Sequence, residues 1–374
     1  MCSDYTSYLL GVTNDLKKPY LTDFVAYARE TAVDVYVIVS VFNVPVDRRE
    51  AEQHQNYSLL FRGVEYETEL PTNSSYPFHS VMKYTLPIRI PNYDQPSEFL
   101  GTFLVTLRNN VQGRVYKDVA VCLRPTPPPV RNTTLCAYVS LYNSEEELMH
   151  WVSYHLYVHV DRIVLYYTAY MPGLEKRLRS LIRQGVIEWV NWMFPQNRLE
   201  LGLPLQLNHQ YAQAMSCFYR HKYSSRFVLL CDTDEYYYAN QQQVVNSLLP
   251  FILKWEREYP EVNAFQVKSN MFLPHRASWK DRNQLLRDGK LFTYFNRKLP
   301  EIYPGRIKLI LTQQFDGIVG LHDCTSCVML APPDDLLRMA HYKVNTHKNA
   351  KEIDHIMVLY SDIVVDKRKE LFGE

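Results

Sequence analysis

Residues 226–238 carry the side chains of this chain that are best suited to chemistry. An apolar run at residues 227–231 leads directly into Asp232, Thr233, Asp234 and Glu235. Carboxylates two residues apart at a strand end can share one divalent cation, and such a cation also binds the oxygens of a diphosphate. The pattern therefore favours transfer of a sugar from a nucleotide diphosphate, whose leaving group gains negative charge. The alternative is a pair of solvated acids that end a strand.

The composition indicates a folded protein that recognises its partners locally. At 374 residues, 47% of them hydrophobic, the chain is longer than one core usually sustains, so two domains are expected. A net charge of +1 argues against a broad surface for nucleic acid or for an anionic membrane. The longest apolar run, at residues 33–42, is short and β-branched, and the N-terminus lacks a signal-peptide pattern. We expect no membrane segment in this chain, so that any native anchor would lie outside it.

Acceptor sequences for N-glycosylation point to the secretory pathway. Asn56, Asn73 and Asn132 each begin an Asn-x-Ser/Thr triplet in turn-like or linker sequence. We expect a lumenal or secreted protein.

The cysteines are consistent with disulfides. Seven cysteines form an odd set, which leaves at least one thiol unpaired. Cys122 and Cys136 could be bridged across a linker, and Cys324 and Cys327 could form a short disulfide. Two unrelated buried thiols are the alternative for the second pair, and a zinc site is disfavoured because no further cysteine pair has ligand spacing.

Residues 124–133 form a proline-rich linker between two regions with different secondary-structure patterns. Four prolines in five residues favour an extended spacer. Before it, residues 1–123 contain short β-rich runs separated by Pro, Asn and Asp turns, which predicts a smaller all-β sandwich-like module. The runs lie at residues 33–44, 80–90, 99–108 and 115–123. Carbohydrate binding and a purely structural role are both open for this module.

Residues 134–374 alternate between strand and helix patterns. Strands are predicted at residues 136–142, 162–167, 186–192 and 227–231, with helices at residues 144–159, 174–184 and 205–223. Ser144 and the acids after it make a plausible helix start, and residues 353–365 a closing helix. The alternation predicts a mostly parallel sheet with helices on both faces, hence an α/β domain. Ligands bind at the carboxyl ends of such strands, where Asn143, Tyr167 and Asp232 all fall.

Short motifs along this second region occur in the order seen in a known family. They are YVSLYNSE from Tyr138, WVSYH from Trp151, RIVLYY from Arg162, CFYR from Cys217, DTDEY from Asp232, RIK from Arg306, GLH from Gly320 and HY from His341. In order and spacing, residues 134–346 resemble the catalytic domain of glycosyltransferase family 92. The resemblance implies a single Rossmann-like nucleotide-sugar domain of GT-A type. It also implies a metal-dependent, inverting enzyme, whose best-known relatives transfer galactose from UDP-galactose to β-linked glycans in the Golgi.

The resemblance implies a Mn²⁺ site formed by Asp232, Asp234 and His322. Manganese accepts oxygen and imidazole ligands together. Asp232 could also accept a hydrogen bond from ribose. His322 matches the family's late histidine, although a lone histidine is more often structural. Glu235 could orient Asp234 or simply cap the turn.

Further residues are expected to bind the donor nucleotide. Asn143 and Glu145 would lie near uracil and ribose, and Tyr167 could stack or form a hydrogen bond there. A role in the turn at the helix N-terminus is the alternative for Asn143. Arg306 and Lys308 could neutralise the diphosphate or be exposed residues of an edge strand. His341 is expected to touch the phosphates or to close the site.

Other prominent side chains have structural interpretations. Trp151 and His155 share one helical face and are expected to pack. Cys217 is expected to be a small buried hydrophobe or a disulfide partner. Trp279, Tyr294 and the tyrosines at residues 236–238 could offer flat faces to sugar rings, while packing in the core is the alternative.

The sequence leaves the catalytic base unassigned. Direct displacement with inversion needs a carboxylate that removes the proton of the acceptor hydroxyl. Asp281, Glu301, Asp316 and Asp323 are all candidates.

We therefore expect an inverting, Mn²⁺-dependent hexosyltransferase that uses UDP-galactose and a glycan acceptor. A glycan-binding protein on a degenerate transferase scaffold is the alternative from another class. A metal-dependent phosphohydrolase is disfavoured because it would need more metal ligands.

Overall fold

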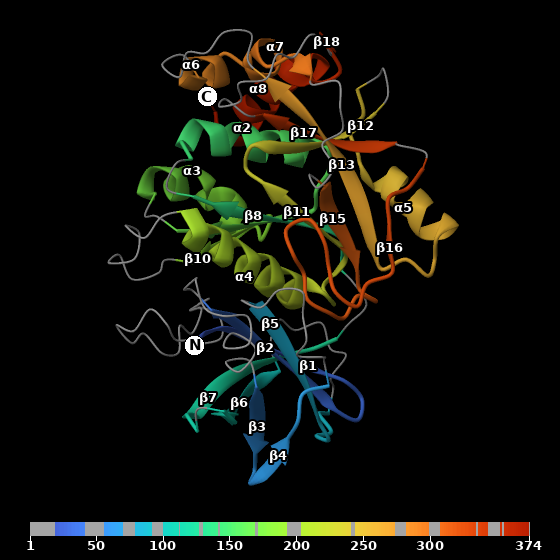
Figure 1. Ribbon diagram of the computed structural model, residues 1–374. Helices are drawn as coiled ribbons and strands as arrows, with labels where there is room; N and C mark the ends of the chain where they lie inside the picture. The colour runs from blue at the N-terminus through green and yellow to red at the C-terminus, as the bar shows by residue number, and fades with distance from the viewer. Residues whose placement is uncertain are drawn as a thin grey trace. The chain divides into compact units, whose positions relative to one another are not determined.

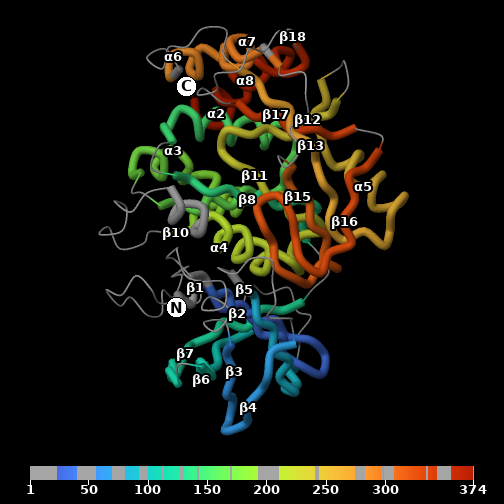
Figure 2. The backbone as a smooth tube through the Cα atoms, in the orientation of Figure 1, coloured from blue at the N-terminus to red at the C-terminus, as the bar shows by residue number. Residues whose placement is uncertain are grey.

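The computed structural model describes most of the chain as two compact units. The described residues are 19–41, 56–69, 79–91, 100–111, 113–126, 130–140, 143–168, 171–192, 203–240, 244–273, 282–298, 307–333, 336–342, 352–353 and 355–373. Unit 1 comprises residues 1–130, 191–226 and 316–326, and unit 2 comprises residues 131–190, 227–315 and 327–374. Figures 1 and 2 show the elements of each unit.

Unit 1 is built on a seven-stranded sheet with the order β4-β3-β6-β7-β1-β2-β5. Its strands are β1 (Pro19–Ala28), β2 (Val33–Val41), β3 (Tyr57–Phe61), β4 (Val64–Tyr66), β5 (His79–Leu86), β6 (Gly101–Asn109) and β7 (Val115–Arg124). Alternate residues of six of these strands meet in one core, as Val33, Val35 and Val37 of β2 illustrate. This period of two is the mark of strands with one face buried.

The opposite face of β1, β2 and β5 carries helix α4 (Leu203–His221), which belongs to the same unit. Tyr36 of β2 packs its ring on Tyr219 of α4 with centroids 4.4 Å apart. The predicted runs at residues 33–44, 80–90, 99–108 and 115–123 correspond to β2, β5, β6 and β7. The all-β character of the module is not confirmed, because its unit also contains α4 and residues 316–326.

Unit 2 contains the remaining strands and helices. Its strands are β8 (Arg131–Val139), β9 (Arg162–Tyr167), β10 (Ile187–Asn191), β11 (Ser225–Asp232), β12 (Glu235–Ala239), β13 (Ala264–Leu273), β14 (Arg297–Lys298), β15 (Ile307–Thr312), β16 (Met329–Leu330), β17 (Leu337–Tyr342) and β18 (Glu352–Ile353). Its helices are α2 (Glu145–Tyr157), α3 (Pro172–Arg183), α5 (Leu249–Glu258), α6 (Arg282–Arg287), α7 (Leu291–Tyr294), the 3₁₀ turn η3 (Met357–Tyr360) and α8 (Ser361–Phe372). The segment predicted as a closing helix thus becomes η3 and α8.

The large sheet of unit 2 is mixed, so the domain is α/β but its sheet is not mostly parallel. The main path runs β10-β9-β8-β11-β15-β13-β14-β18. β8 and β9 pair in parallel, as the alternation of strand and helix predicts. β11 and β13 both pair antiparallel with β15. The prediction is wrong there because β15 enters the sheet between β11 and β13 and runs in the opposite direction to both.

Helix α2 begins where the sequence predicts it. The Ser144 side chain accepts from the Glu147 amide, while the Glu147 carboxylate accepts from the Ser144 amide, which completes a capping box. Glu145–Glu147 place negative charge in the first turn, where the helix dipole favours it. This fixed helix start positions the loop after β8.

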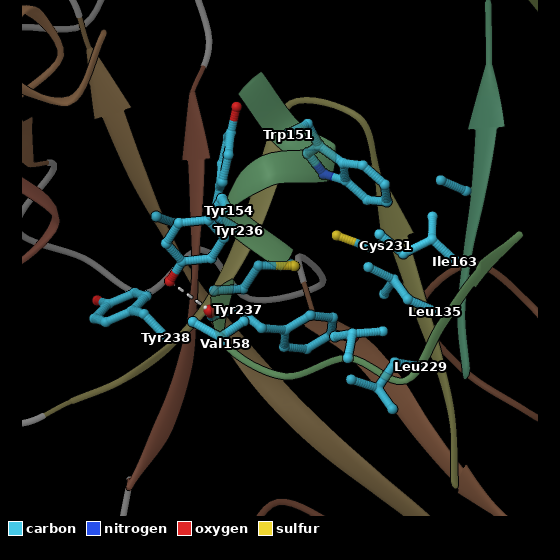
Figure 3. Close-up of a cluster of buried hydrophobic side chains, with 14 of the residues drawn as sticks. Leu135, Trp151, Tyr154, Val158, Ile163, Leu229, Cys231, Tyr236, Tyr237 and Tyr238 are labelled. Carbon is cyan, nitrogen blue, oxygen red and sulfur yellow. Dashed lines mark hydrogen bonds between the residues drawn. The ribbon is translucent and has the colours of Figure 1, made fainter. Parts of the chain in front are cut away.

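The core of unit 2 joins α2, α3 and α5 to one face of the sheet. Trp151 and Tyr154 of α2 lie over Leu135 of β8, Leu229 of β11 and the tyrosines of β12 (Figure 3). The Tyr154 hydroxyl donates to the Tyr237 carbonyl over 2.7 Å, the dashed contact in Figure 3. The strand after the acidic triplet is therefore held from both its backbone and its side chains.

Within the described residues, no helix combines the length and the apolarity needed to cross a membrane.

His155 is a buried histidine that folding keeps neutral. Its Nδ1–H donates to the Trp151 carbonyl over 2.9 Å, which leaves Nε2 as an acceptor buried without a partner. The ring stacks on Tyr236 at an interplanar angle of 12°. Burial lowers the pKa of His155 to about 3, and the hydrogen bond to Trp151 opposes the shift only in part.

This buried histidine predicts acid sensitivity of the fold. Since the unfolded pKa is about 6.5, the stabilising contribution of neutral His155 is complete above that pH and is lost as the pH falls toward its folded value. One such group changes the free energy of unfolding by at most about 1.4 kcal/mol per pH unit. His155→Phe, which keeps a ring against Tyr236, should flatten the decline in urea-measured stability below about pH 6.5. His159→Asn, at an exposed position, is the control. Equal slopes for wild type and His155→Phe would contradict this interpretation.

Candidate active site

The acidic triplet occupies the turn between β11 and β12. Asp232 ends β11, and Glu235 begins β12 after Thr233 and Asp234. The Asp232 amide donates to Glu235 Oε2 over 2.8 Å, and the Tyr342 amide donates to the Asp234 carbonyl over 2.9 Å. The turn is thus fixed by its own side chain and by β17.

Glu235 is the buried centre of this site. Its side chain is 2% exposed, and its carboxylate lies 3.1 Å from Lys308 Nζ and 3.4 Å from His341 Nδ1. The Trp151 indole donates to the Glu235 carbonyl over 2.8 Å. Burial and the charge of Asp232 raise the pKa of Glu235, while Lys308 and His341 lower it. Glu235 therefore caps the turn through the Asp232 amide, which was one of its two interpretations, and it also contacts both Lys308 and His341.

Lys308 lies on β15 in the interior of the sheet. Its side chain is 2% exposed, and Nζ lies 2.7 Å from Asp232 Oδ2. Burial lowers the pKa of Lys308, but the charges of Asp232 and Glu235 raise it more, so the ammonium stays protonated. An exposed position on an edge strand, one of the two interpretations of Lys308, is wrong because β15 pairs with β11 and β13.

His341 faces the other aspartate of the motif. It lies opposite Glu235 in the pairing of β12 with β17, and its Nε2 is 3.3 Å from Asp234 Oδ2. Burial lowers the pKa of the imidazole, but Asp234, Glu235 and Asp232 raise it above its ordinary value. Each aspartate of the motif thus has a basic side chain against it.

The chemistry of this cluster fits a divalent cation. Three carboxylates face one lysine and one histidine, so negative charge remains in excess even with the imidazole protonated. Asp232 and Asp234 are 29% and 34% exposed, so solvent reaches these two acids. No preformed group of three His, Cys, Asp or Glu ligands occurs among the described residues. The two accessible carboxylates therefore supply suitable oxygen donors but not a complete ligand set.

The predicted site residues fall in different places. Asp232, Asp234, Lys308 and His341 come together in unit 2. His322 belongs to residues 316–326 of unit 1, so its role as a metal ligand stays a prediction. Arg306, Asp281, Glu301 and Trp279 lie outside the described residues.

Residues predicted near the nucleotide lie at the carboxyl ends of β8 and β9. The Asn143 side chain accepts from the Ser140 amide over 2.8 Å, so it shapes the loop after β8. Glu145 is 40% exposed in the first turn of α2. Tyr167 ends β9 and stacks on Trp189 of β10, with ring centroids 4.6 Å apart and planes at 15°.

The two described candidates for the base differ in their surroundings. Asp316 lies 2.9 Å from Lys83 Nζ and 3.3 Å from Lys222 Nζ. Asp323 is exposed, and its carbonyl accepts from the Gly320 amide over 2.8 Å. Asp316 is engaged in ion pairs, whereas the side chain of Asp323 faces solvent.

Most aromatic candidates are core residues. Tyr236, Tyr237 and Tyr238 are at most 2% exposed, so their predicted use as sugar platforms is wrong and packing is confirmed. Trp151 and His155 are also fully buried, as expected. Tyr294 is half-buried beside the Phe295 ring.

The cysteines within the described residues divide into five bonded residues and one thiol. Cys122, Cys136, Cys217, Cys324 and Cys327 are disulfide-bonded, which fits the secretory pathway. Cys231 is free, buried directly before the acidic turn, and its Sγ–H donates to the Glu235 carbonyl over 3.2 Å. Of the three predicted acceptor asparagines, Asn56 and Asn132 are exposed, the latter on β8 rather than in a linker, and Asn73 lies outside the described residues.

Sequence reasoning missed Trp189, and it missed that Lys308 and His341 pair with the acids of the triplet. Trp189 lies on the strand next to the one that Tyr167 ends, so aromatic residues on successive predicted strands were the available signal. The pairing of Lys308 with Asp232 joins residues 76 positions apart and has no local signal.

An α/β sheet with acidic residues at the end of a central strand is an arrangement suited to enzymes that bind nucleotides. Residues 131–307 match the model of glycosyltransferase family 92. The match confirms the resemblance drawn from the motifs and supports the assignment of the chain as a glycosyltransferase. No curated protein matches the chain.

Solved structures show weaker similarity. TarS from S. aureus in complex with UDP is 13% identical over 37% of this chain and 36% of its own, with a TM-score of 0.25. The mannosyltransferase PcManGT from Pyrobaculum calidifontis, in complex with GDP-Man and Mn²⁺, is 11% identical over 66% of this chain and 75% of its own, with a TM-score of 0.32. Glucosyl-3-phosphoglycerate synthase from Mycobacterium tuberculosis with Mn²⁺ and UDP is 13% identical over 65% of this chain and 81% of its own, with a TM-score of 0.24. Scores this low carry no argument about function.

Removal of the Lys308 ammonium should destabilise the fold strongly. Lys308→Met leaves the buried Glu235 carboxylate without its closest cation, and breaking a buried pair costs about 3–5 kcal/mol. The free energy of unfolding in urea measures this loss. Lys268→Met, on the adjacent strand β13, is the control and should cost far less. The double variant Lys308→Met/Glu235→Gln should recover part of the stability, and a loss equal to that of Lys268→Met would show that the pair is not buried.

Proposed function

We propose that this chain is an inverting, Mn²⁺-dependent glycosyltransferase that moves a hexose, galactose from UDP-galactose, onto a glycan acceptor. The observation that carries this proposal is the pair of accessible carboxylates, Asp232 and Asp234, at the end of β11 within the family 92 segment. Their fixed position and the excess negative charge around them suit a cation that binds a diphosphate.

Asp232 and Asp234 would hold the metal, with His322 as the third protein ligand. When bound, the metal supplies positive charge to the diphosphate leaving group of the donor. Lys308 would hold the Asp232 carboxylate in place, and His341 would hold that of Asp234. Their positive charges would offset the repulsion between these acids and Glu235.

The nucleotide would lie over the carboxyl ends of β8 and β9. Tyr167, backed by Trp189, would present an aromatic face to uracil. Glu145, half-exposed in the first turn of α2, would accept from the ribose hydroxyls, and Asn143 would shape the loop between them. Arg306 would add a positive charge near the diphosphate.

The acceptor hydroxyl requires a base for direct displacement. Asp323 fits this role better than Asp316, because its side chain faces solvent whereas Asp316 pairs with two lysines. Asp281 and Glu301 remain candidates. The reaction would occur in the Golgi lumen or after secretion, where disulfides persist.

Binding of UDP should depend on Mn²⁺ and on Asp234. UDP should raise the melting temperature of the wild-type protein only when Mn²⁺ is present, because ligands that bind the folded state stabilise it. Asp234→Asn should abolish this shift and lower turnover by about 100-fold or more. Asp288→Asn, which changes an exposed carboxylate on the same unit, is the control. An unchanged turnover rate in Asp234→Asn would overturn the site assignment, and glycan binding without any UDP response would favour the lectin alternative.

The enzyme should distinguish UDP-sugar donors by their sugar. We expect UDP release in the presence of UDP-galactose and a galactose-, glucose- or N-acetylglucosamine-terminated acceptor, and slower release with UDP-glucose. Release that requires no acceptor would favour hydrolysis, and a preference for UDP-glucose would refute the proposed donor.

A further inference from the structure

Glu145 and Gly173 meet beside the carboxyl ends of β8 and β9 in unit 2. Glu145 begins α2, shortly after β8, and Gly173 lies in the first turn of α3, which follows β9. The two strands are parallel neighbours, and Val139 pairs with Tyr167 at this end. Helices α2 and α3 contact one another (Figure 1). Both residues therefore belong to the edge of the sheet where ligands of α/β domains bind.

The Glu145 carboxylate occupies the space that a Cβ of residue 173 would need. A Cβ on Gly173 would lie 2.8 Å from Glu145 Oε2, 2.9 Å from its Cδ and closer still to Oε1, which is well inside van der Waals contact. The φ of Gly173 lies outside the left-handed region, so its backbone conformation does not require glycine. Alanine is also the better helix former. The close approach of the carboxylate is therefore what explains a glycine at this position.

The first turn of α3 favours a carboxylate at this place. The N-cap residue, Met171, makes no side-chain hydrogen bond to the helix, and Pro172 has no amide hydrogen to donate. The amides of a first turn carry the positive end of the helix dipole, which attracts the charge of Glu145. Arg177, one turn further along α3, places Nη1 3.9 Å from Glu145 Oε2. A side chain of α2 is thus held by the start of α3.

Arg177 is itself fixed by ion pairs that join three helices. Its Nη1 lies 3.4 Å from Glu146 Oε1, and Glu146 Oε2 accepts from Arg368 of α8 over 2.6 Å. The side chain of Arg368 is buried, so its pair with Glu146 is screened less than a surface ion pair. Glu145, at the outer end of this network, remains accessible to solvent. A carboxylate that is both oriented and accessible is suited to bind a ligand.

We propose that Gly173 is a positioning residue, which lets α3 hold the Glu145 carboxylate where it accepts from the two ribose hydroxyls of the donor nucleotide. The two oxygens of one carboxylate can accept from two adjacent hydroxyls. The site would thereby select a ribonucleotide over its deoxy analogues. This inference rests on the proposed function, because it requires a nucleotide over the carboxyl ends of β8 and β9.

The experiment measures the affinity of the full chain for UDP and for its 2′,3′-dideoxy analogue, by calorimetry at saturating Mn²⁺. The wild type should bind UDP about 10- to 100-fold more tightly than the analogue, the range expected for hydrogen bonds to a charged acceptor. Gly173→Ala should reduce this preference to about threefold or less, because a Cβ displaces the carboxylate. Glu145→Ala, which removes the carboxylate, should have the same effect.

Stability and a double variant separate positioning from damage to the fold. The atoms that meet the Cβ end a flexible side chain, so Gly173→Ala should shift the melting temperature by less than about 3 °C and leave affinity for the dideoxy analogue unchanged. Gly173→Ala/Glu145→Ala should match Glu145→Ala alone, since both changes act on one carboxylate. Lys176→Ala, at an exposed position on α3, is the control and should keep the full preference.

Three outcomes would overturn the proposal. Equal affinity of the wild type for UDP and the dideoxy analogue would show that Glu145 does not contact the ribose and only caps α3. A full preference in Gly173→Ala, with loss of the preference in Glu145→Ala, would show that the carboxylate needs no space at residue 173. Equal weakening of both nucleotides in Gly173→Ala would indicate general damage to the site. Failure of the proposed function is distinct, because the wild type would then bind neither nucleotide in the presence of Mn²⁺.

Discussion

The burial of the Glu235 carboxylate is the constraint on which the candidate site depends. A charged group removed from water costs several kcal/mol unless it is paired and hydrogen-bonded. Glu235 meets that requirement through Lys308 of β15 and His341 of β17, and the same two side chains contact Asp232 and Asp234. The two partly exposed aspartates therefore acquire fixed positions only once β11, β12, β15 and β17 have assembled. Formation of the site and completion of the sheet are one event.

Unit 1 uses the same physical device for a different purpose. Asp23 on β1 is buried and receives Arg220 and Ser216 from α4. Apolar packing alone would allow a helix to slide over the sheet, whereas a bidentate pair is satisfied in one register only. Arg220 of the CFYR motif thus has a structural role, because it fixes α4 on the sheet. In both units, polar contacts fix the relative positions of elements that hydrophobic packing alone would not fix.

Local signals in the sequence predicted the parts of the structure that depend on neighbouring residues. The capping box at Ser144 and the β-branched run of β9 defined elements whose ends agree with the structure within a few residues. The acidic triplet was identified because its members are adjacent. The pairing of Lys308 with Asp232 spans 76 positions and follows from the antiparallel insertion of β15, which no local pattern encodes. The ion pairs of Asp316 were likewise invisible, since Lys83 precedes it by 233 positions.

The thiol of Cys231 has a consequence for a chain whose other described cysteines are bonded. Burial raises the pKa of this thiol well above its ordinary value, and its proton is engaged by the carbonyl of Glu235. A protonated, enclosed sulfur is a poor nucleophile, so it cannot exchange with the disulfides of the molecule while the strand end is closed. The rate at which Cys231 is alkylated would therefore measure how often β11 separates from its neighbours and the acidic turn opens.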